Sequence, residues 1–225
     1  MKFVLLSGGS GKRLWPLSNE SRSKQFLKIL QKDNDEFESM LQRVWRQLKE
    51  VNLDQSAYIA SSKAQTEIIR NQLGNEVRMI TEPARRDTFP AVCLAASYLY
   101  SMNDVNRDEV IVVLPVDVYV ERSFFHRLID LEKPLRSDDY QLVLLGVKPT
   151  YPSEKYGYIV PVKLDEENEW LRVHFFKEKP TMEVAEQLIR QNAIWNWGVF
   201  AFKLGYMISL LEDKGFPIHY DELVA

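Results

Sequence analysis

The sequence has little capacity for covalent cross-linking, because Cys93 is the only cysteine among its 225 residues. This excludes an internal disulfide bond and fits a reducing compartment. Cys93 lies in the apolar run 91–96, where a packed thiol is expected rather than a nucleophile. No apolar run approaches the length of a transmembrane helix, and the apolar N-terminal stretch is too short for a signal-peptide core. We therefore expect a cytoplasmic protein with no membrane partner.

Basic residues are not in excess, since 29 lysines and arginines face 32 aspartates and glutamates. The formal net charge of −3 argues against a nucleic-acid partner, because general nucleic-acid binding usually shows as a basic surplus. The three histidines are widely separated and lack metal-ligand spacing. The sequence shows no Ser-His-Asp or Cys-His arrangement, which disfavours a covalent mechanism.

The most informative stretch that is present follows the apolar segment 3–6, where the glycine-rich run 8–11 predicts a sharp turn with exposed amides for an anion. Arg13 and Lys24 add two positive charges, a combination that suits a nucleoside triphosphate. The spacing does not match a Walker loop. A dinucleotide fingerprint is also excluded, because it needs a glycine where Leu14 stands. The alternative interpretation is an ordinary turn with incidental charges.

Apolar, β-rich runs alternate with segments of helical period, which predicts an α/β fold with a mostly parallel sheet and helices on both faces. In the first half we expect strands 2–7, 57–60, 77–80 and 110–114, and helices at about 36–49, 62–73 and 89–102. In the second half we expect strands 141–146, 157–162, 171–177 and 197–202, and helices at about 121–136, 182–191 and 204–213. A solvated turn is expected over 163–170, and Thr181 is the expected hydroxyl N-cap of the helix that follows it.

Ligands of parallel sheets collect at the carboxyl ends of the strands. The glycine-rich run follows strand 2–7 and Asp117 follows strand 110–114, so both are predicted to lie at one sheet edge. A carboxylate at this edge suits Mg²⁺, which takes one or two carboxylates from a protein and its other ligands from phosphates and water. The alternative for Asp117 is a turn or cap aspartate.

Two motifs near the N-terminus are Gly-Gly-Ser-Gly-Lys-Arg-Leu-Trp-Pro-Leu-Ser, which begins at Gly8 and ends at residue 18, and Lys-Gln-Phe-Leu at 24–27. Together they closely resemble the signature of bacterial mannose-1-phosphate guanylyltransferases, a family of sugar-1-phosphate nucleotidyltransferases. Further matches follow in the family's order at 82–88, 114–117, 149–150, 156–159, 178–180 and 195–200. Together they span nearly the entire chain. The resemblance implies a Rossmann-like, glycosyltransferase-A-like nucleotidyltransferase fold with a mostly parallel mixed sheet and helices on both faces.

The same resemblance implies an enzyme that forms GDP-mannose and pyrophosphate from GTP and mannose 1-phosphate by Mg²⁺-assisted in-line displacement. Two alternatives stay open for the function: an enzyme that uses another sugar 1-phosphate or another nucleotide, and a catalytically silent relative that binds sugar nucleotide. Assembly as a homodimer also stays open.

On the nucleotide side, the resemblance implies that Arg13 faces the triphosphate, that Lys24 faces the α-phosphate, and that Asp117 binds the metal. The nucleotide-binding candidates are Gly8, Gly9, Ser10, Gly11, Arg86, Asp87 and Thr88. The chain departs from the family motif around the metal ligand, since Val116 replaces a small residue and Val118 replaces a histidine.

The segment 85–88 reads Arg-Arg-Asp-Thr where the family more often has Gly-Arg-Asn-Thr. We hypothesise that Asp87 lies near the guanine edge, because a carboxylate can accept from both N1–H and the 2-amino group. A salt bridge between Asp87 and a neighbouring arginine is the alternative.

On the sugar-phosphate side, the resemblance implies that Gly157 permits close approach of the sugar and that Asn196 binds a hydroxyl. Glu178 is expected to accept from sugar hydroxyls and Lys179 to hold the phosphate. The alternative for Gly157 is a glycine at a strand bulge. Glu178 and Lys179 could instead belong to a surface turn, and Asn196 could be a turn asparagine.

We expect a single nucleotidyltransferase domain over 1–225, with a nucleotide half at about 1–120 and a sugar-phosphate half at about 121–225. Members of the family carry a second metal-binding acid later in their chains. Asp221 is no convincing match, since only four residues follow it. We therefore expect a domain truncated at its C-terminal end that binds GTP but transfers its nucleotidyl group poorly.

Overall fold

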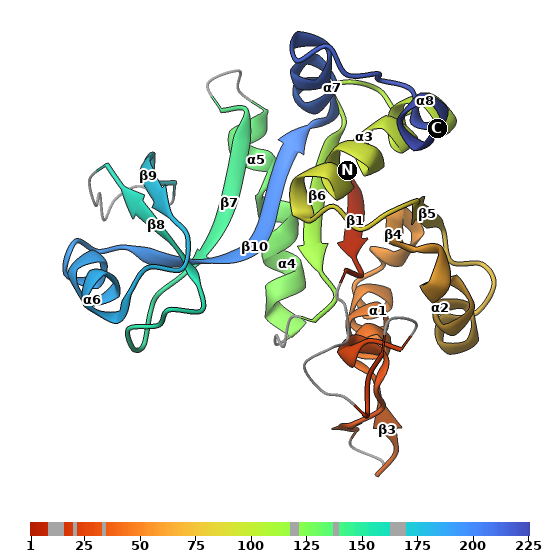
Figure 1. Cartoon of the computed structure of the whole chain (residues 1–225), viewed down its shortest axis with the longest axis horizontal. Helices are drawn as coiled ribbons and strands as arrows, with labels where there is room; N and C mark the ends of the chain where they lie inside the picture. Colours follow the sequence, from red (N-terminus) through yellow and green to blue (C-terminus); the bar gives the residue numbers. More distant parts are fainter. Residues whose placement is uncertain (9–15, 20–21, 33–34, 118–121, 137–139, 163–169) are drawn as a thin grey trace. The chain divides into compact units, whose positions relative to one another are not determined.

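The computed structural model describes residues 1–8, 16–19, 22–32, 35–117, 122–136, 140–162 and 170–225 (Figure 1). The chain divides into two compact units, one of residues 1–142 with 201–225 and the other of residues 143–200. The predicted division near residue 120 concerns ligand binding, so these units do not test it.

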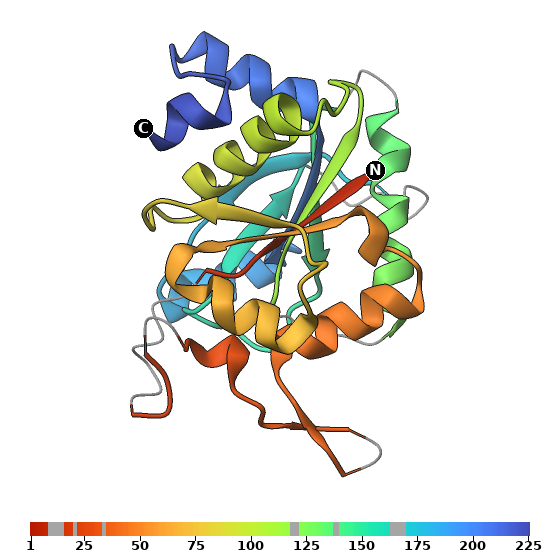
Figure 2. The ribbon, with the colours of Figure 1, turned by 90° about the vertical axis from the view of Figure 1, so that its right-hand side faces the viewer.

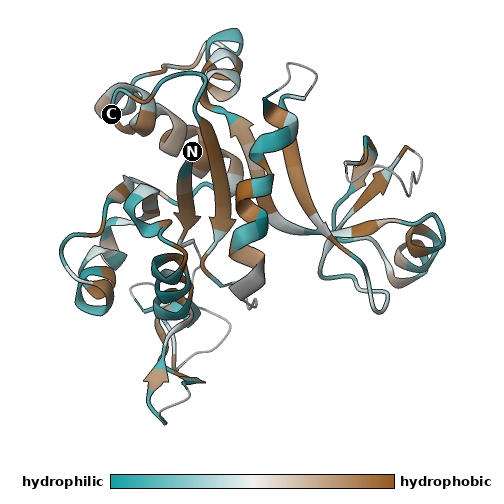
Figure 3. Ribbon diagram, turned by 180° about the vertical axis from the view of Figure 1, so that it is seen from behind, coloured by the Kyte–Doolittle hydropathy of each residue, from teal (hydrophilic) through white to brown (hydrophobic). Residues whose placement is uncertain are grey.

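The first unit is built on parallel strands in the order β5-β4-β1-β6. Their bounds are Lys2–Leu6 for β1, Ala57–Ser62 for β4, Met79–Glu82 for β5 and Val110–Pro115 for β6. Strand β1 pairs in parallel with both β4 and β6, and β4 with β5. The central strands are almost entirely buried and hydrophobic, as expected for a sheet covered on both faces (Figure 3). This confirms the predicted α/β class.

Two groups of helices cover this sheet. The helices are α1 (Met40–Glu50), α2 (Thr66–Leu73), α3 (Thr88–Met102), α4 (Arg122–Asp130), α5 (Glu132–Leu135), α7 (Leu204–Asp213) and α8 (Tyr220–Val224). Helix α3 contacts both α7 and α8, whereas α1 contacts both α2 and α4. Figure 2 shows α3 and α7 on one side of the strands and α1 and α2 on the other, so the predicted two-sided cover is confirmed.

Short elements complete the first unit. They are the 3-10 turns η2 (Lys24–Phe26), η3 (Asp54–Ser56) and η4 (Lys63–Gln65), and the strands β2 (Leu30–Gln31) and β3 (Phe37–Glu38). The two strands pair with each other as a separate antiparallel ribbon. Turn η2 carries the predicted Lys24, and η4 follows directly after β4.

Three expected helices and two expected strands have different bounds in the structure. The helix expected at about 62–73 begins at Thr66, after turn η4. The strand expected over 77–80 lies two residues later as β5, and the strand expected from 197 begins three residues earlier as β10. The helix expected from 36 begins at Met40, because Ser39 and Gln42 form a capping box in which each side chain bonds the other's backbone N–H at 3.1 Å. The helix expected over 121–136 is divided, with α4 ending at Asp130 and α5 starting at Glu132. Pro134 accounts for the division, because it has no N–H to donate to the carbonyl four residues earlier.

The second unit contains an antiparallel arrangement. Its elements are β7 (Leu142–Val147), β8 (Gly157–Pro161), β9 (Val173–Lys177), α6 (Met182–Arg190) and β10 (Ile194–Lys203). The first residue of β7 and the last three residues of β10 belong to the first unit. Strand β8 pairs with β9 and with β10, and β7 pairs with β10. A small core of Tyr158, Val160, Ala185, Leu188 and Ala193 joins α6 to β8.

Helix α6 begins where predicted, but its cap differs. Thr181 occupies the N-cap position without a capping hydrogen bond from its hydroxyl. The Glu154 carboxylate accepts instead from Met182 N at 3.1 Å. A carboxylate from another segment thus satisfies a free amide of the first turn and suits the positive end of the helix.

Candidate functional site

Strands β1 and β6 end side by side. Leu6 is in register with Pro115, and Val116 N donates to the Leu6 carbonyl at 3.2 Å. Gly8 and Asp117 therefore lie just beyond neighbouring strand ends, which confirms the predicted common edge. Val116 itself is buried in the core.

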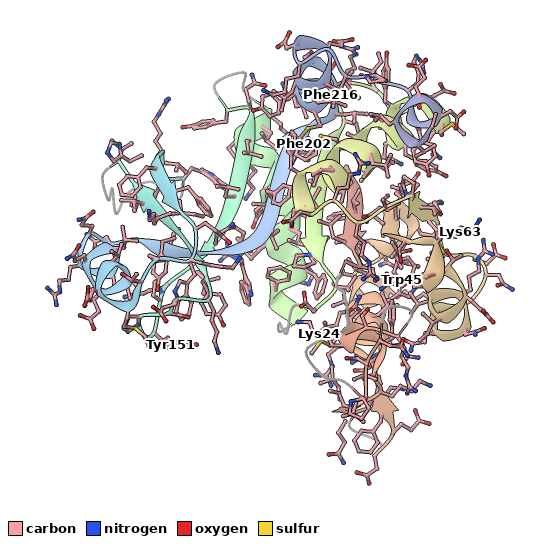
Figure 4. All side chains as sticks on the ribbon, in the orientation of Figure 1. Lys24, Trp45, Lys63, Tyr151, Phe202 and Phe216 are labelled. Carbon is pink, nitrogen blue, oxygen red and sulfur yellow. The ribbon has the colours of Figure 1, made fainter. Side chains whose placement is uncertain are left out.

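Lys24 and Asp117 form an ion pair at this edge. Lys24 Nζ lies 2.5 Å from Asp117 Oδ2, and the two side chains are 47% and 35% exposed. Figure 4 shows Lys24 near the end of the sheet where β1 and β6 terminate. The structure thus brings together two residues whose roles the sequence analysis placed at one reaction centre.

Only the start of the predicted glycine loop belongs to the described part of the chain. Gly9, Ser10, Gly11 and Arg13 lie outside the described residues, as does Val118. Gly8 is exposed, and no atom lies within 4 Å of the position that a Cβ would take. Among the described residues, nothing fills the space beside this backbone.

A buried polar network supports the same edge, and the sequence analysis did not identify it. Gln25 is buried, and its Nε2 donates to the Ser7 carbonyl at 3.2 Å and lies 3.4 Å from the Gly8 carbonyl. Gln65 is also buried and contacts Ser7 and Ser23. These side chains tie the end of β1 to the turn that carries Lys24.

The segment Arg85–Thr88 is exposed and leads into α3. Asp87 has a positive φ of 72°, and its carboxylate accepts from Thr88 N at 2.9 Å, which caps the helix. Its hypothesised role beside a guanine edge stays a prediction.

Arg86 lines a cavity of about 460 Å³ between the end of β5 and helices α3, α7 and α8. Glu82, Phe89, Cys93 and Phe216 contribute to the same walls. Burial raises the pKa of the Glu82 carboxyl against the opposing effect of Arg85. Burial also raises the pKa of the Cys93 thiol to about 11, which agrees with a packed thiol and not with an activated nucleophile.

The second unit brings the four predicted sugar-phosphate residues together. Gly157 in β8 is in register with Asn196 in β10. A Cβ on Gly157 would lie 2.6 Å from Glu178 Oε2 and would also collide with the Phe176 ring. Glycine is therefore required here because other side chains pass over its backbone, and the bulge of this strand pair lies at Val160 and Pro161 instead.

Lys179 lies beside the same carboxylate. Its Nζ is 2.7 Å from Glu178 Oε1, and its backbone has a positive φ of 40°. Asn196 Oδ1 accepts from Gly198 N at 3.1 Å, within β10 and not within an isolated turn. The predicted acid, base, amide and glycine thus gather around three paired strands.

Aromatic side chains accompany these residues. Trp195 contacts Tyr151 and Tyr156, with ring centroids 5.1 Å and 4.7 Å apart. Trp195 also packs against the core of this unit, whereas Trp197 is exposed. The two tryptophans therefore have different environments, which their common sequence motif did not distinguish.

Two classes of feature are not found in the part of the chain that the structure describes. No three histidine, cysteine, aspartate or glutamate side chains there form a group able to hold a metal ion. No helix built from those residues is long and apolar enough to cross a membrane.

Comparisons with known proteins agree with this geometry. The family model described as nucleotidyl transferase matches residues 2–217. A mannose-1-phosphate guanylyltransferase of Escherichia coli is 36% identical over 97% of this chain and 50% of its own length. The alginate biosynthesis protein AlgA of Pseudomonas fluorescens is 33% identical over 98% of this chain and 45% of its own length. The chain thus spans about half the length of these curated relatives.

Among solved structures, one from Thermus thermophilus described as a mannose-1-phosphate geranyltransferase has a TM-score of 0.79 and 30% identity. The match covers 99% of this chain and 62% of that one. UDP-glucose pyrophosphorylase has a TM-score of 0.60 at 15% identity, over 99% of this chain and 84% of its own, which supports the fold alone.

Proposed function

Because the chain belongs to the nucleotidyl transferase family, as the family model over residues 2–217 shows, we propose that it transfers a nucleotidyl group to a sugar 1-phosphate. We further propose GTP and mannose 1-phosphate as substrates, with GDP-mannose and pyrophosphate as products. The names of the curated relatives and the guanylyltransferase motifs of this sequence support that choice.

The single observation that carries this proposal is the Lys24–Asp117 ion pair at the common end of β1 and β6. A nucleotidyl transfer site must hold a cationic partner for the phosphates and a carboxylate for a cation next to the glycine-rich turn. Here both charges lie at the edge where that turn begins, and both are partly exposed to an incoming ligand.

We propose Mg²⁺ as the cation. Asp117 fits it, because Mg²⁺ prefers oxygen ligands and takes few of them from the protein. When bound, the ion supplies positive charge that stabilises the phosphate oxygens during displacement.

The chain's own residues then act mainly by positioning and charge neutralisation. Lys24 is proposed to contact the α-phosphate once the nucleotide separates it from Asp117. Arg13 is proposed to contact the triphosphate, and Arg86 and Thr88 to border the base with Asp87. The amides of the glycine-rich run are proposed to approach the base and the ribose, and they belong to Gly8, Gly9, Ser10 and Gly11.

The second unit is proposed to hold the sugar phosphate. The Lys179 ammonium suits the phosphate, and the Glu178 carboxylate and Asn196 amide suit sugar hydroxyls. Gly157 is proposed to permit close approach of the sugar, which requires Glu178 and Phe176 to move from the position above its backbone.

The test is a pyrophosphate-release assay with GTP, ATP, CTP and dTTP, each combined with mannose 1-phosphate or glucose 1-phosphate in the presence of Mg²⁺. We expect turnover to be greatest with GTP and mannose 1-phosphate and to be abolished by a chelator. Preference for another pair would reassign the substrates within the family.

A different result would overturn the catalytic part of the proposal. If calorimetry shows that the chain binds GDP-mannose while no substrate pair releases pyrophosphate, the protein is a sugar-nucleotide-binding relative without transferase activity.

A further inference from the structure

Gln65 is a fully buried polar residue at the end of the 3-10 turn that follows β4. Its amide lies among the Ser7 carbonyl, the Ser23 hydroxyl and the Arg85 guanidinium. A carbonyl oxygen requires a donor and a guanidinium requires an acceptor, so these neighbours determine the orientation of the amide.

In that orientation the nitrogen donates to Ser7 O at 2.9 Å. The oxygen accepts from Arg85 Nη2 at 2.9 Å and from Ser23 Oγ at 3.0 Å. One side chain therefore joins three separate segments. They are the end of β1 where the glycine loop begins, the turn that carries Lys24, and the segment that leads to Arg86.

The link to Lys24 is direct. Lys24 stands between Ser23, which bonds Gln65, and Gln25, which bonds the Ser7 carbonyl. The Ser23 hydroxyl does not cap turn η2. Its contact with Gln65 therefore connects the turn to the network and plays no part in starting the turn. Both neighbours of Lys24 are thus attached to the network at the end of β1, while its own Nζ extends to Asp117.

We propose that Gln65 is a positioning residue that acts through Lys24 and Arg85. It holds Lys24 and the segment 83–88 in fixed relation to the end of β1, and it touches no substrate itself. The inference concerns how the site of the proposed function is held together, and it therefore rests on that function.

Gln65 can hold these segments in place because a buried polar group must keep its hydrogen-bond partners, which leaves the attached segments few alternative positions. Replacing Gln65 with an apolar residue of similar size removes one partner each from the Ser7 carbonyl, the Arg85 guanidinium and the Ser23 hydroxyl. The turn that carries Lys24 then has fewer contacts to hold it. A displacement of about 1 Å at a reacting group can cost on the order of a hundredfold in rate.

The first test is independent of catalysis and compares Gln65→Met with Gln47→Met. Gln47 is a buried glutamine of α1 that is not among the three Gln65 contacts described above, and it serves as the matched control. We expect amide hydrogen exchange in Gln65→Met to accelerate at least about fivefold over residues 22–27 and 83–88, with the exchange of β6 unchanged. Equal exchange in both variants and the wild type would overturn the proposed coupling.

The second test uses turnover with saturating GTP in a cycle with Lys24→Met. We expect Gln65→Met to lower kcat about tenfold or more while the KM for the sugar phosphate changes less than about threefold. In the Lys24→Met background the same change should have less than about a twofold effect, because the residue through which it acts is gone. Fully additive effects would show a merely structural role and overturn the inference.

If Gln65→Met does not fold, Ser23→Ala breaks the same link by removing one hydroxyl. It should reproduce the faster exchange over residues 22–27 and the loss in kcat, and normal values of both would contradict the inference. Absence of turnover in the wild-type protein would instead count against the proposed function. The exchange experiment would still decide whether Gln65 holds the three segments together.

Discussion

The two units each present a lysine paired with a carboxylate, but they assemble the pair in different ways. In the first unit Lys24 meets Asp117 at 2.5 Å from a distant part of the sequence. In the second unit Lys179 meets its own neighbour, Glu178, at 2.7 Å. The first pair exists only because the turn that carries Lys24 packs beside the end of β6, whereas the second depends on the backbone conformation of two consecutive residues.

The supports of the two pairs differ accordingly. Buried amides of Gln25 and Gln65 hold the turn that carries Lys24. The second pair is more exposed, at 62% and 54%, and the bare backbone of Gly157 lies beneath Glu178. We therefore expect changes in the first unit to alter the rate of the chemical step and changes in the second to alter the affinity for the sugar phosphate.

The largest expected effect is that of Asp117→Asn, which keeps the size of the side chain and removes its charge. Turnover should fall at least about a hundredfold, because the proposed metal would lose its charged protein ligand at the proposed phosphoryl-transfer centre. Asp130→Asn, which alters an aspartate at the end of α4 that pairs with Lys133, serves as the control and should retain full activity. Turnover of Asp117→Asn within a few-fold of wild type at low Mg²⁺ would contradict the assignment.

The next effect is that of Lys179→Ala on substrate affinity. Loss of a charge-assisted phosphate contact is worth about 1.5–3 kcal/mol, so the KM for the sugar phosphate should rise roughly 10- to 150-fold. GTP affinity measured by calorimetry should change little, as should both parameters in Lys155→Ala, an exposed lysine of the same unit. An equal fall in GTP affinity would contradict the assignment of the nucleotide to the first unit and of the sugar phosphate to the second.

Gly157→Ala should produce a smaller change at the same place. The added methyl group collides with Phe176 and Glu178, so the carboxylate must shift and the KM for the sugar phosphate should rise about tenfold. Thermal unfolding should show a loss of stability of about 1–3 kcal/mol, typical of overpacking. Wild-type values of both quantities would show that β8 and β9 adjust freely here.

The smallest expected effect concerns Glu82, a buried carboxyl in the first unit that differs from the exposed Glu178 of the second pair. Burial raises the pKa of this group in the folded state, so folding favours its protonated form. Stability therefore falls as the pH rises from the unfolded pKa through the folded pKa. Glu82→Gln should remove this loss and stabilise the protein by on the order of 1 kcal/mol at pH 7.5, and by less at pH 4.5.

Urea unfolding at the two pH values measures the Glu82→Gln effect. Glu178→Gln is the matched control, because its carboxylate is exposed and its replacement should change stability little at either pH. An equal gain for Glu82→Gln at pH 4.5 and pH 7.5 would show that ionisation of Glu82 is not its cause.

Features that follow from the order of strands and helices along the sequence were largely predictable. The common edge of Gly8 and Asp117 followed from the rule that parallel strands end together, and the structure confirms it. Two of the helix bounds that were wrong had readable causes, since Ser39 with Gln42 and Pro134 are local signals. The cap of α6 was not readable, because Glu154 comes from a separate segment.

The network around Gln65 could not be predicted for a related reason. A glutamine in a polar segment resembles a surface residue, and its burial becomes evident only when β1, the Lys24 turn and the Arg85 segment are assembled. No short motif contains all of these partners. The glycine requirement at Gly157 is similar, because the atoms that exclude a Cβ belong to Phe176 and Glu178.

The sequence by itself determined the α/β class, the family and the types of residue available for phosphate and sugar contacts. These properties are encoded in periodicity, strand-end position and short ordered motifs, all of which are local along the chain. Only the tertiary structure decided that Lys24 pairs with Asp117 and that Gln65 is a buried junction. Such contacts join residues far apart in the sequence, and their distances depend on how the strands and turns pack.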